Sequence, residues 1–414
     1  MPEVKSFQNV FDFLYHRKGT YGVTYKLDRV ILLFEKLGIR EVPFKVIHVT
    51  GTNGKGSTSA MLESIYRNAG YKTGLFTSPH LVSVCERIQV DCQQITEKDF
   101  VRLFQKVFPV AEALERENKE FRISFFEYIT AIALLFFKEK KIDIAVMEVG
   151  LGGRLDATNA VENTTISVIT TIAFDHENVL GNTLPAIAKE KSGIIRQNSL
   201  CVLGKNISGE VRETIAQVAR EKNCELFQVS RIASVFSEVD YQNYNAATAK
   251  LTAQVLTDHD IFPVTESQIE FGIKHFFWPG RWQKFQIRDT LLIFDGAHNE
   301  EGAQVLAKEI KKLNRDVTLV FGSNTVERAT KMLAILAPLC QEIFFTKSSH
   351  ESALGVILLK KCISEANYCK IGNIELEKIS DLVHNRGGRV VLVAGSLYLV
   401  GDIMKQLNMS HEID

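Results

Sequence analysis

The stretch from Val49 to Thr58 carries the residue types that bind phosphate groups in proteins. It reads VTGTNGKGST, with glycines at 51, 54 and 56. Glycine lacks a Cβ, so backbone amides can close around phosphate oxygens. Lys55 adds a mobile positive charge, and Ser57 or Thr58 offers a hydroxyl to a metal ion. The stretch departs from the standard P-loop pattern, because Gly56 separates the lysine from the hydroxyl. A structural Gly-rich turn is the alternative.

Polar side chains follow three further apolar runs of the sequence. They are Ser78, Glu148 and the triplet Asp175-His176-Glu177. Ligands of open α/β sheets bind at the carboxyl ends of strands, so the three groups should share one sheet edge. A carboxylate there is costly unless it is paired or binds a cation, and Glu148 therefore indicates a Mg²⁺ site. Mg²⁺ prefers oxygen ligands, so His176 would be an unusual ligand and would indicate a partly softer site.

Three other groups are ambiguous on spacing alone. Lys191, in AKEKSGI, is typical of a solvated helix end with cations near its C-terminus. Arg281, in WPGR, is suited to phosphate, but it could equally pair with a nearby acid. Asp295 and His298, in DGAHN, follow an apolar strand, where a polar turn is the plainer interpretation.

The elements that must position these residues alternate between strand and helix. Strands are expected at 44–50, 72–78, 86–90, 142–149, 166–172 and 200–204, and helices at 57–68, 97–117, 124–140, 185–194 and 211–222. Near-continuous apolar strands indicate a mostly parallel sheet covered on both faces. The alternation breaks at WPGR and restarts, with strands at 291–295, 317–322, 343–346 and 390–395 and a helix at 302–313. We therefore expect an α/β, P-loop-type domain over residues 1–280 and a smaller Rossmann-like α/β domain over 281–414.

Composition narrows the class of protein and its partners. A chain of 414 residues is long enough for two or three domains. Lys plus Arg and Asp plus Glu each number 49, so no excess charge favours nucleic acid or an acidic membrane as a partner. The seven cysteines form no C-x-x-C pair, which favours reduced, buried thiols in a cytoplasmic protein. No apolar run is long enough to predict a membrane span.

Together these stretches resemble the folylpolyglutamate synthase/dihydrofolate synthase family of the Mur ligase superfamily. The matching stretches, in chain order, are HVTGTNGKGST (48–58), FTSPHL (76–81), ERI (86–88), EVGLGGRLDATNAV (148–161), DHENVLG (175–181), AKEKSGI (188–194), WPGRWQ (278–283), DGAHN (295–299) and GSLYLVGDI (395–403). The opening loop is therefore interpreted as the phosphate-binding loop of that family, with its hydroxyl one residue later.

The resemblance implies roles for individual residues. Binding of the nucleotide is implied for Gly51, Thr52, Asn53, Gly54, Lys55, Gly56, Ser57, Thr58, Asn245, Arg281 and Asp295. Metal binding is implied for Ser57, Ser78, Glu148, His176 and Lys191, and catalysis for Lys55, His176, Lys191 and His298. Substrate contacts are implied for Arg87, Arg154, Asp156, Thr158, Asn159 and Ser396. Lys191 is also expected to be carbamylated, which requires a site that lowers the pKa of its amine.

The sequence departs from the family pattern at three places. Tyr241 stands where many members have histidine, Glu300 follows DGAHN in place of proline, and the stretch from Phe321 to Val326 lacks the usual lysine and aspartates. The first departure lies beside the expected adenine-binding Asn245. The other two lie in the second domain, so they affect the expected glutamate and folate specificity more than ATP binding.

The resulting hypothesis is an ATP- and Mg²⁺-dependent ligase, with two Mg²⁺ sites, that adds L-glutamate to dihydropteroate, a folate or both. RLDATN favours a bifunctional enzyme. The expected partners are these small molecules, with no nucleic acid and no membrane, and the chain is expected to be a monomer. Two alternatives remain. One is a cell-wall Mur ligase acting on a UDP-sugar peptide, although only about 45 residues precede the loop, too few for a further folded domain. The other is a nucleotide-binding regulator that has lost catalysis.

Overall fold

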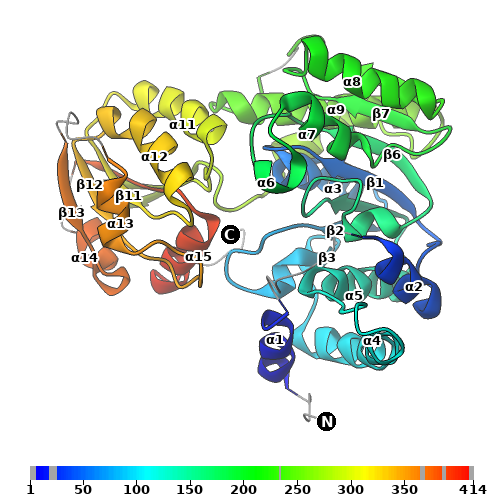
Figure 1. Cartoon of the computed structure of the whole chain (residues 1–414). Coiled ribbons are helices and arrows are strands. Elements are labelled where there is room, and N and C mark those ends of the chain that lie inside the picture. Colours follow the sequence, from blue (N-terminus) through cyan, green and yellow to red (C-terminus); the bar gives the residue numbers. More distant parts are fainter. Residues whose placement is uncertain (1–5, 18–25, 233–234, 364–368, 385–387, 410–414) are drawn as a thin grey trace. The chain divides into compact units, whose positions relative to one another are not determined.

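The computed structural model describes the chain except for residues 1–5, 18–25, 233–234, 364–368, 385–387 and 410–414 (Figure 1). The chain divides into two compact units. The first comprises Met1–Ser78 and Val84–Phe276, and the second comprises Pro79–Ser83 and Phe277–Asp414. The main division after Phe276 lies near the boundary expected at residue 280. The inclusion of Pro79–Ser83 in the second unit was not expected from the sequence.

An eight-stranded sheet with the order β4-β3-β2-β5-β1-β6-β7-β8 forms the centre of the first unit. The six strands from β2 to β8 in this order are parallel, and β3 and β4 extend the sheet as antiparallel strands. Successive residues of β1 and β5 are buried, so both faces of the sheet are covered, as a parallel sheet requires. The strands are β1 (Lys45–Thr50), β2 (Thr73–Phe76), β3 (Ile88–Val90), β4 (Gln93–Gln94), β5 (Ile144–Glu148), β6 (Thr164–Ile169), β7 (Leu200–Leu203) and β8 (Glu225–Gln228).

The helices of the first unit begin at sequence signals that are mostly local. Ser124 forms a capping box with Glu127 at the start of α5, as its Ser-x-x-Glu spacing favours. Thr96 is the N-cap of α4, and its side chain accepts from the Asp99 amide. The helices are α1 (Phe7–Tyr15), α2 (Asp28–Leu37), α3 (Lys55–Asn68), α4 (Glu97–Glu117), α5 (Phe125–Lys140), α6 (Glu177–Leu180), α7 (Leu184–Ser192), α8 (Gly209–Glu221), α9 (Asp240–Asp258) and α10 (Glu266–Lys274), with 3₁₀ turns η1 (Val84–Arg87) and η2 (Ala157–Ala160).

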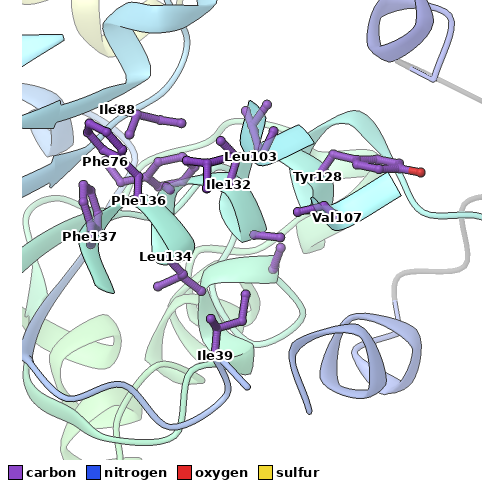
Figure 2. Close-up of a cluster of buried hydrophobic side chains, with 14 of the residues drawn as sticks. Ile39, Phe76, Ile88, Leu103, Val107, Tyr128, Ile132, Leu134, Phe136 and Phe137 are labelled. Carbon is purple, nitrogen blue, oxygen red and sulfur yellow. The ribbon is translucent and has the colours of Figure 1, made fainter. Parts of the chain in front are cut away.

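A large apolar core joins α1, α2, α4 and α5 to the sheet (Figure 2). Phe76 of β2 and Phe137 of α5 are fully buried in it, together with Tyr128. The rings of Phe104 and Tyr128 stack with centroids 5.6 Å apart. Burial of such side chains is the dominant stabilising contribution in a domain of this size, and it fixes α5 beside the carboxyl end of β2.

The second unit contains a six-stranded sheet with the order β13-β12-β11-β14-β10-β9. Five strands are parallel, and β9 is antiparallel to β10. The strands are β9 (Gln283–Ile287), β10 (Thr290–Phe294), β11 (Val317–Phe321), β12 (Glu342–Phe345), β13 (Lys370–Asn373) and β14 (Val390–Ala394). The helices are α11 (Glu300–Leu313), α12 (Val326–Leu336), α13 (Val356–Lys361), α14 (Ile379–His384) and α15 (Leu397–Gln406), with 3₁₀ turns η3 (Ala337–Leu339) and η4 (Leu376–Lys378).

Several local expectations were wrong in detail. The strand expected over 86–90 begins only at Ile88, because η1 occupies the preceding residues. The strand expected over 72–78 ends at Phe76, which leaves Ser78 in a loop. All seven cysteines are free, as expected, but Cys92 is exposed rather than buried. It lies in the turn between β3 and β4, where its φ of 63° keeps the backbone in the left-handed region.

Among the helices of the described residues, none combines the length and the apolar character that a membrane span requires.

Candidate active site

The glycine loop of the first unit connects β1 to the N-terminus of α3. Gly54 has a φ of 85°, a conformation that favours glycine, and a Cβ at this position would collide with Oδ1 of Asn245. A Cβ at Gly51 would collide with Oγ1 of Thr170. Both glycines are therefore required by the packing of the loop. The helix begins at Lys55, two residues earlier than expected.

The carboxyl end of β6 holds the first half of this loop. The amide of Thr52 donates to the Thr171 carbonyl at 2.8 Å, and the amide of Asn53 donates to Thr171 Oγ1 at 3.0 Å. Thr170 Oγ1 donates to the Asn53 carbonyl at 2.6 Å. The amides of Thr52 and Asn53 are thus engaged by protein. The amides that a helix leaves without intrahelical partners, at its N-cap and first turn, are the groups available for phosphate.

Two lysines converge on one carbonyl oxygen of the loop. Lys55 Nζ donates to Gly51 O at 3.0 Å, and Lys191 Nζ donates to the same oxygen at 2.9 Å. Lys191 belongs to the last turn of α7, and its residue is only 4% exposed. The expectation of a solvated helix end on spacing alone is therefore wrong. Lys55 thus places a positive charge beside the N-terminus of α3, and the amine of Lys191 shares the same acceptor oxygen.

Burial, together with the positive charge of Lys55, lowers the pKa of Lys191 to about 7, although Asp175 and Asp156 oppose the change. A substantial fraction of the amine is therefore neutral near neutral pH. A neutral amine is the form that reacts with carbon dioxide to give a carbamate. The site therefore provides the condition that a carbamylated lysine requires.

The structure brings Ser78 and Glu148 together at the carboxyl edge of the sheet. The Ser78 amide donates to Glu148 Oε2 at 3.0 Å, and Glu148 is 3% exposed. A carboxylate and a hydroxyl supply hard oxygen atoms, which suit Mg²⁺. On the phosphate loop, Thr58 Oγ1 is a buried hydroxyl oxygen with no hydrogen-bond partner among the described residues. The oxygen atoms of Ser78 and Glu148 fit a Mg²⁺ ion that completes its shell with phosphate oxygens and water.

His176 lies in a different setting from Glu148. Its side chain is 45% exposed, its φ is 51°, and its Nε2 lies 3.9 Å from an Asp175 oxygen. No group of three or more His, Cys, Asp or Glu side chains suited to a metal occurs within the described part of the chain. The predicted ligand set contains only Glu148 and His176 of these types, and its other members are the hydroxyls of Ser57 and Ser78 and the expected carbamate of Lys191.

Helix α9 places its amide side chains against the loop. Asn245 Nδ2 donates to Gln242 Oε1 at 3.1 Å, and Gln242 Nε2 approaches Ser57 Oγ at 3.5 Å. Both residues are buried. The predicted nucleotide-binding Asn245 therefore contacts the phosphate loop through Gly54, and Gln242 is an additional neighbour that the sequence did not single out.

The segment from Arg154 to Asn159 is mostly occupied by internal contacts. Asp156 Oδ1 accepts from the amide of Thr158 at 3.0 Å and from its hydroxyl at 2.5 Å. Asn159 Nδ2 donates to the carbonyls of Arg154 and Gly193 at 3.0 and 3.1 Å. Arg154 pairs with Glu190 through its guanidinium. Their predicted substrate contacts thus remain predictions, and Arg154 is the exposed member of the group.

Arg87 lies at the end of η1, next to the large apolar core of the first unit. It is 4% exposed, and its guanidinium carbon lies 5.3 Å from the centroid of the Phe125 ring. A buried cation above an aromatic face is held in a defined position. Its predicted contact with substrate remains a prediction.

The candidate residues of the second unit surround the carboxyl end of β10. Asp295 Oδ2 accepts from the Trp282 amide at 3.0 Å, and Oδ1 accepts from the Ala297 amide at 2.8 Å. His298 Nδ1 lies 2.8 Å from the Gly296 carbonyl. A Cβ at Gly296 would collide with the Arg281 guanidinium, so this arginine lies directly over the turn.

Ser396 and Asn299 occupy the N-cap positions of two helices in the second unit. Asn299 caps α11 by accepting from the Gly302 amide at 2.9 Å, which explains why the helix begins at Glu300 and not at 302. Ser396 is buried at the N-cap of α15, and its side chain makes no capping bond there. The predicted residues of this unit therefore lie at the carboxyl ends of β10 and β14, which are adjacent strands.

Sequence reasoning missed two classes of residue. Thr170 and Thr171, which hold the loop, lie within the strand predicted over 166–172, whereas the observed strand β6 already ends at Ile169. A pair of hydroxyl residues at the end of that apolar run could have indicated them. His48 was noted only as the first letter of a matching stretch. It is 1% exposed, and its Nε2 lies 2.7 Å from Thr158 Oγ1. Only the fold shows that these two residues meet.

Comparison with known proteins identifies the families that the two parts of the chain match. Residues 49–273 match the Mur ligase middle domain, and residues 281–406 match the dihydrofolate synthetase C-terminal domain. A dihydrofolate synthase/folylpolyglutamate synthase of Bacillus subtilis is 31% identical over 95% of this chain and 97% of its own length. An enzyme of the same name from Escherichia coli is 37% identical over 72% of this chain and 71% of its own.

Solved structures extend the comparison to the whole chain. Folylpolyglutamate synthase of Thermotoga maritima superimposes with a TM-score of 0.82 at 30% identity, covering 97% of each chain. Escherichia coli FolC, in complex with DHPP and ADP, gives a TM-score of 0.85 at 30% identity and covers 99% of each chain. The chain therefore belongs to the dihydrofolate synthase/folylpolyglutamate synthase family of Mur ligases.

Proposed function

We propose that this protein is an ATP-dependent ligase that joins L-glutamate to dihydropteroate and to reduced folates. The observation that carries the proposal is the convergence of Lys55 and Lys191 on Gly51 O at the N-terminus of α3. Such a position suits the terminal phosphates of a nucleotide. Relatives with both names, and a related structure with Mn, AMPPNP and L-glutamate bound, support the same activity.

The proposed reaction has two steps. A carboxylate oxygen of the pterin substrate attacks the γ-phosphorus of ATP, and ADP leaves as the acyl phosphate forms. The amine of glutamate then attacks the acyl carbon, phosphate leaves with the bonding electrons, and the nitrogen loses a proton to give the amide. Lys55 and the first-turn amides of α3 offset the charge on the transferring phosphoryl group, and positioning supplies most of the remaining acceleration.

Metal binding and carbamylation belong to this proposal. Ser57, Ser78, Glu148 and His176 would hold Mg²⁺, and a carbamylated Lys191 would help to hold a second Mg²⁺. Mg²⁺ supplies charge neutralisation of the phosphates when it is bound. Lys191 would reach the metal from the last turn of α7, where its amine already lies against the loop.

The second unit is proposed to serve recognition. Arg281, Asp295, His298 and Ser396 are assigned to the nucleotide and the incoming glutamate, while Arg87, Arg154, Asp156, Thr158 and Asn159 are assigned to the pterin substrate. Domain limits of 1–280 and 281–414, a monomeric state and a cytoplasmic location complete the proposal. The location is supported by the seven free thiols, which suit a reducing compartment.

ADP release is the direct test of the activity. The purified protein is supplied with ATP, Mg²⁺ and one of three acceptors, which are dihydropteroate, tetrahydrofolate and a UDP-sugar peptide, each with and without glutamate. Glutamate-dependent release with both pterin acceptors is expected. Release with the UDP-sugar peptide alone would indicate a cell-wall ligase. Release with none of them would indicate a nucleotide-binding protein without this catalysis.

A further inference from the structure

A histidine outside the assigned machinery is buried in the middle of β1. His48 is 1% exposed and lies between Ile47 and Val49 in the centre of the sheet. Burial lowers the pKa of His48 to about 3, and the charge of Arg196 contributes, so the imidazole is neutral. Its Nδ1 is buried with no hydrogen-bond partner among the described residues. An aliphatic side chain would avoid this cost, so the imidazole requires an explanation.

The other ring nitrogen of His48 begins a chain of hydrogen bonds. Nε2 lies 2.7 Å from Thr158 Oγ1, and that hydroxyl lies 2.5 Å from Asp156 Oδ1. The Thr158 hydroxyl has one proton, and the Asp156 carboxylate is the acceptor for it. With Asp156 as the carboxylate acceptor, His48 carries its proton on Nε2 and donates to Thr158. This assignment leaves Nδ1 as the bare nitrogen, in agreement with its lack of a partner.

Asp156 connects this chain of hydrogen bonds to the turn Gly150–Gly153, called here the glycine turn. Its Oδ2 accepts from the Leu151 amide at 2.9 Å. On the other side of the turn, Thr50 Oγ1 donates to the Gly152 carbonyl at 2.7 Å. His48 and Thr50 are both residues of β1. The strand thus holds the glycine turn at two points.

The glycine turn lies between the residues proposed to hold the metal. It directly follows Glu148 and Val149 in the chain. A Cβ at Gly153 would lie 2.8 Å from the Lys191 carbonyl, and the Arg154 amide donates to the Glu190 carbonyl at 2.9 Å. The turn is therefore packed against the last turn of α7, from which Lys191 reaches the loop. A displaced turn would change the separation of Glu148 and Lys191.

We propose that His48 is a positioning residue of the ligase, which acts through Thr158 and Asp156 to fix the glycine turn and with it the Mg²⁺-binding geometry. This inference rests on the proposed function for its metal site but not for the identity of the acceptor. Outer hydrogen-bond partners of this kind commonly change metal affinity by about 10- to 100-fold when they are removed.

The test compares His48→Leu, His48→Gln, Thr158→Val, Thr158→Ser and the double variant H48L/T158V. Thr164→Val is the matched control, because it removes a buried hydroxyl that has no partner among the described residues, from β6 of the same sheet. Binding of a non-hydrolysable ATP analogue is measured by titration calorimetry, with and without Mg²⁺. Binding of Mn²⁺ is followed by electron paramagnetic resonance, and the unfolding temperature is recorded for each variant.

His48→Leu and Thr158→Val should each weaken Mn²⁺ binding by roughly 10-fold or more while metal-free nucleotide binding is retained. The double variant should lose little more than either single variant, because both residues act in one chain. His48→Gln and Thr158→Ser, which keep a donor and a hydroxyl, should restore most of the affinity.

Two results would overturn the proposal. One is a Thr158→Val variant with the Mn²⁺ affinity of the control, which is decisive even where His48→Leu does not fold. The other is additive loss in the double variant. A wild-type protein that binds Mn²⁺ and nucleotide but releases no ADP with any acceptor would contradict the proposed function and leave these binding measurements interpretable.

Discussion

The carboxyl edges of the two sheets each present an acid at the end of an apolar strand, but they use it differently. In the first unit, Glu148 lies at an edge where Lys55 and Lys191 approach one carbonyl oxygen. In the second unit, Asp295 accepts hydrogen bonds from the backbone amides of Trp282 and Ala297, and these bonds hold the turn that follows β10. The first edge brings two lysines to one oxygen, whereas the second uses its acid to hold the backbone of its own turn.

The largest effect is expected at the charged edge itself. Lys55→Ala removes an ammonium group from the phosphate position, and ADP release should fall by at least about 100-fold. Lys189→Ala, an exposed lysine of α7, is the control and should be active. Near-normal turnover of Lys55→Ala would show that the lysine of the loop is not needed for the reaction. The proposed difference between the two edges would then be wrong.

Lys191→Ala should lose roughly 10- to 100-fold of the activity, because it removes both the amine and any carbamate that binds metal. Short carboxylic acids, added at increasing concentration, should restore part of the rate by supplying the missing oxygens. The assay is ADP release with and without acetate. Full activity without rescue would make the carbamate irrelevant.

The lowered pKa of Lys191 predicts a pH dependence. The amine is neutral above a pKa of about 7 and protonated below it. Carbamate formation requires the neutral amine, so the rate should fall as pH decreases through about 7, by roughly 10-fold for one further unit. Profiles measured at fixed bicarbonate check this. The acid-rescued Lys191→Ala variant should lack the same decline, and an identical decline would assign it to another group.

Gly54→Ala tests whether the contact between the loop and α9 matters for nucleotide binding. Its φ of 85° and the collision with Asn245 should together weaken binding of an ATP analogue by roughly 10-fold. Gly70→Ala is matched in backbone strain, with a φ of 94° and nothing within 4 Å of the added Cβ. Equal binding by the two variants would show that contact between the loop and α9 has no role in nucleotide binding.

The smallest effect on nucleotide binding is expected in the second unit. Asp295→Asn replaces one acceptor oxygen by an NH₂ group, and it should destabilise the local turn by about 1–3 kcal/mol. Hydrogen exchange at the Trp282 and Ala297 amides measures this loss. Asp289→Asn, exposed in the turn between β9 and β10, is the control. A fall in ADP release as large as that of Lys55→Ala would contradict the division between the two edges.

Much of the fold could be predicted from local pattern. The helix over 97–117 and most strands were expected near their observed positions, because apolar periodicity and capping residues are local signals. Helix α9 was not predicted, since its sequence DYQNYNAATAKLTAQVLTD has few large apolar residues and is held by packing on α3. The burial of Lys191 was also not predictable from spacing, because the sequence of α7 is typical of a solvent-exposed helix end and only its packing shows that the lysine is buried.

Contacts between distant segments explain the rest. The pairing of Asp156 with Thr158 is local and could be inferred from its spacing at an N-cap. The contact of Thr158 with His48 spans 110 positions of sequence and depends on the sheet register. Candidate site residues could therefore be proposed from sequence, whereas the long-range contact of Thr158 with His48 could not be predicted from it.

The membership of Pro79–Ser83 in the second unit affects how the protein can be divided. Leu81 packs on the apolar core of that unit, and a Cβ at Gly401 would collide with its carbonyl oxygen. The polypeptide thus passes between the units at 78/79, 83/84 and 276/277. A fragment beginning at Phe277 would lack a built-in piece of its own interior. Separate production of the two halves should therefore yield an incomplete C-terminal body unless a peptide spanning residues 79–83 is supplied in trans.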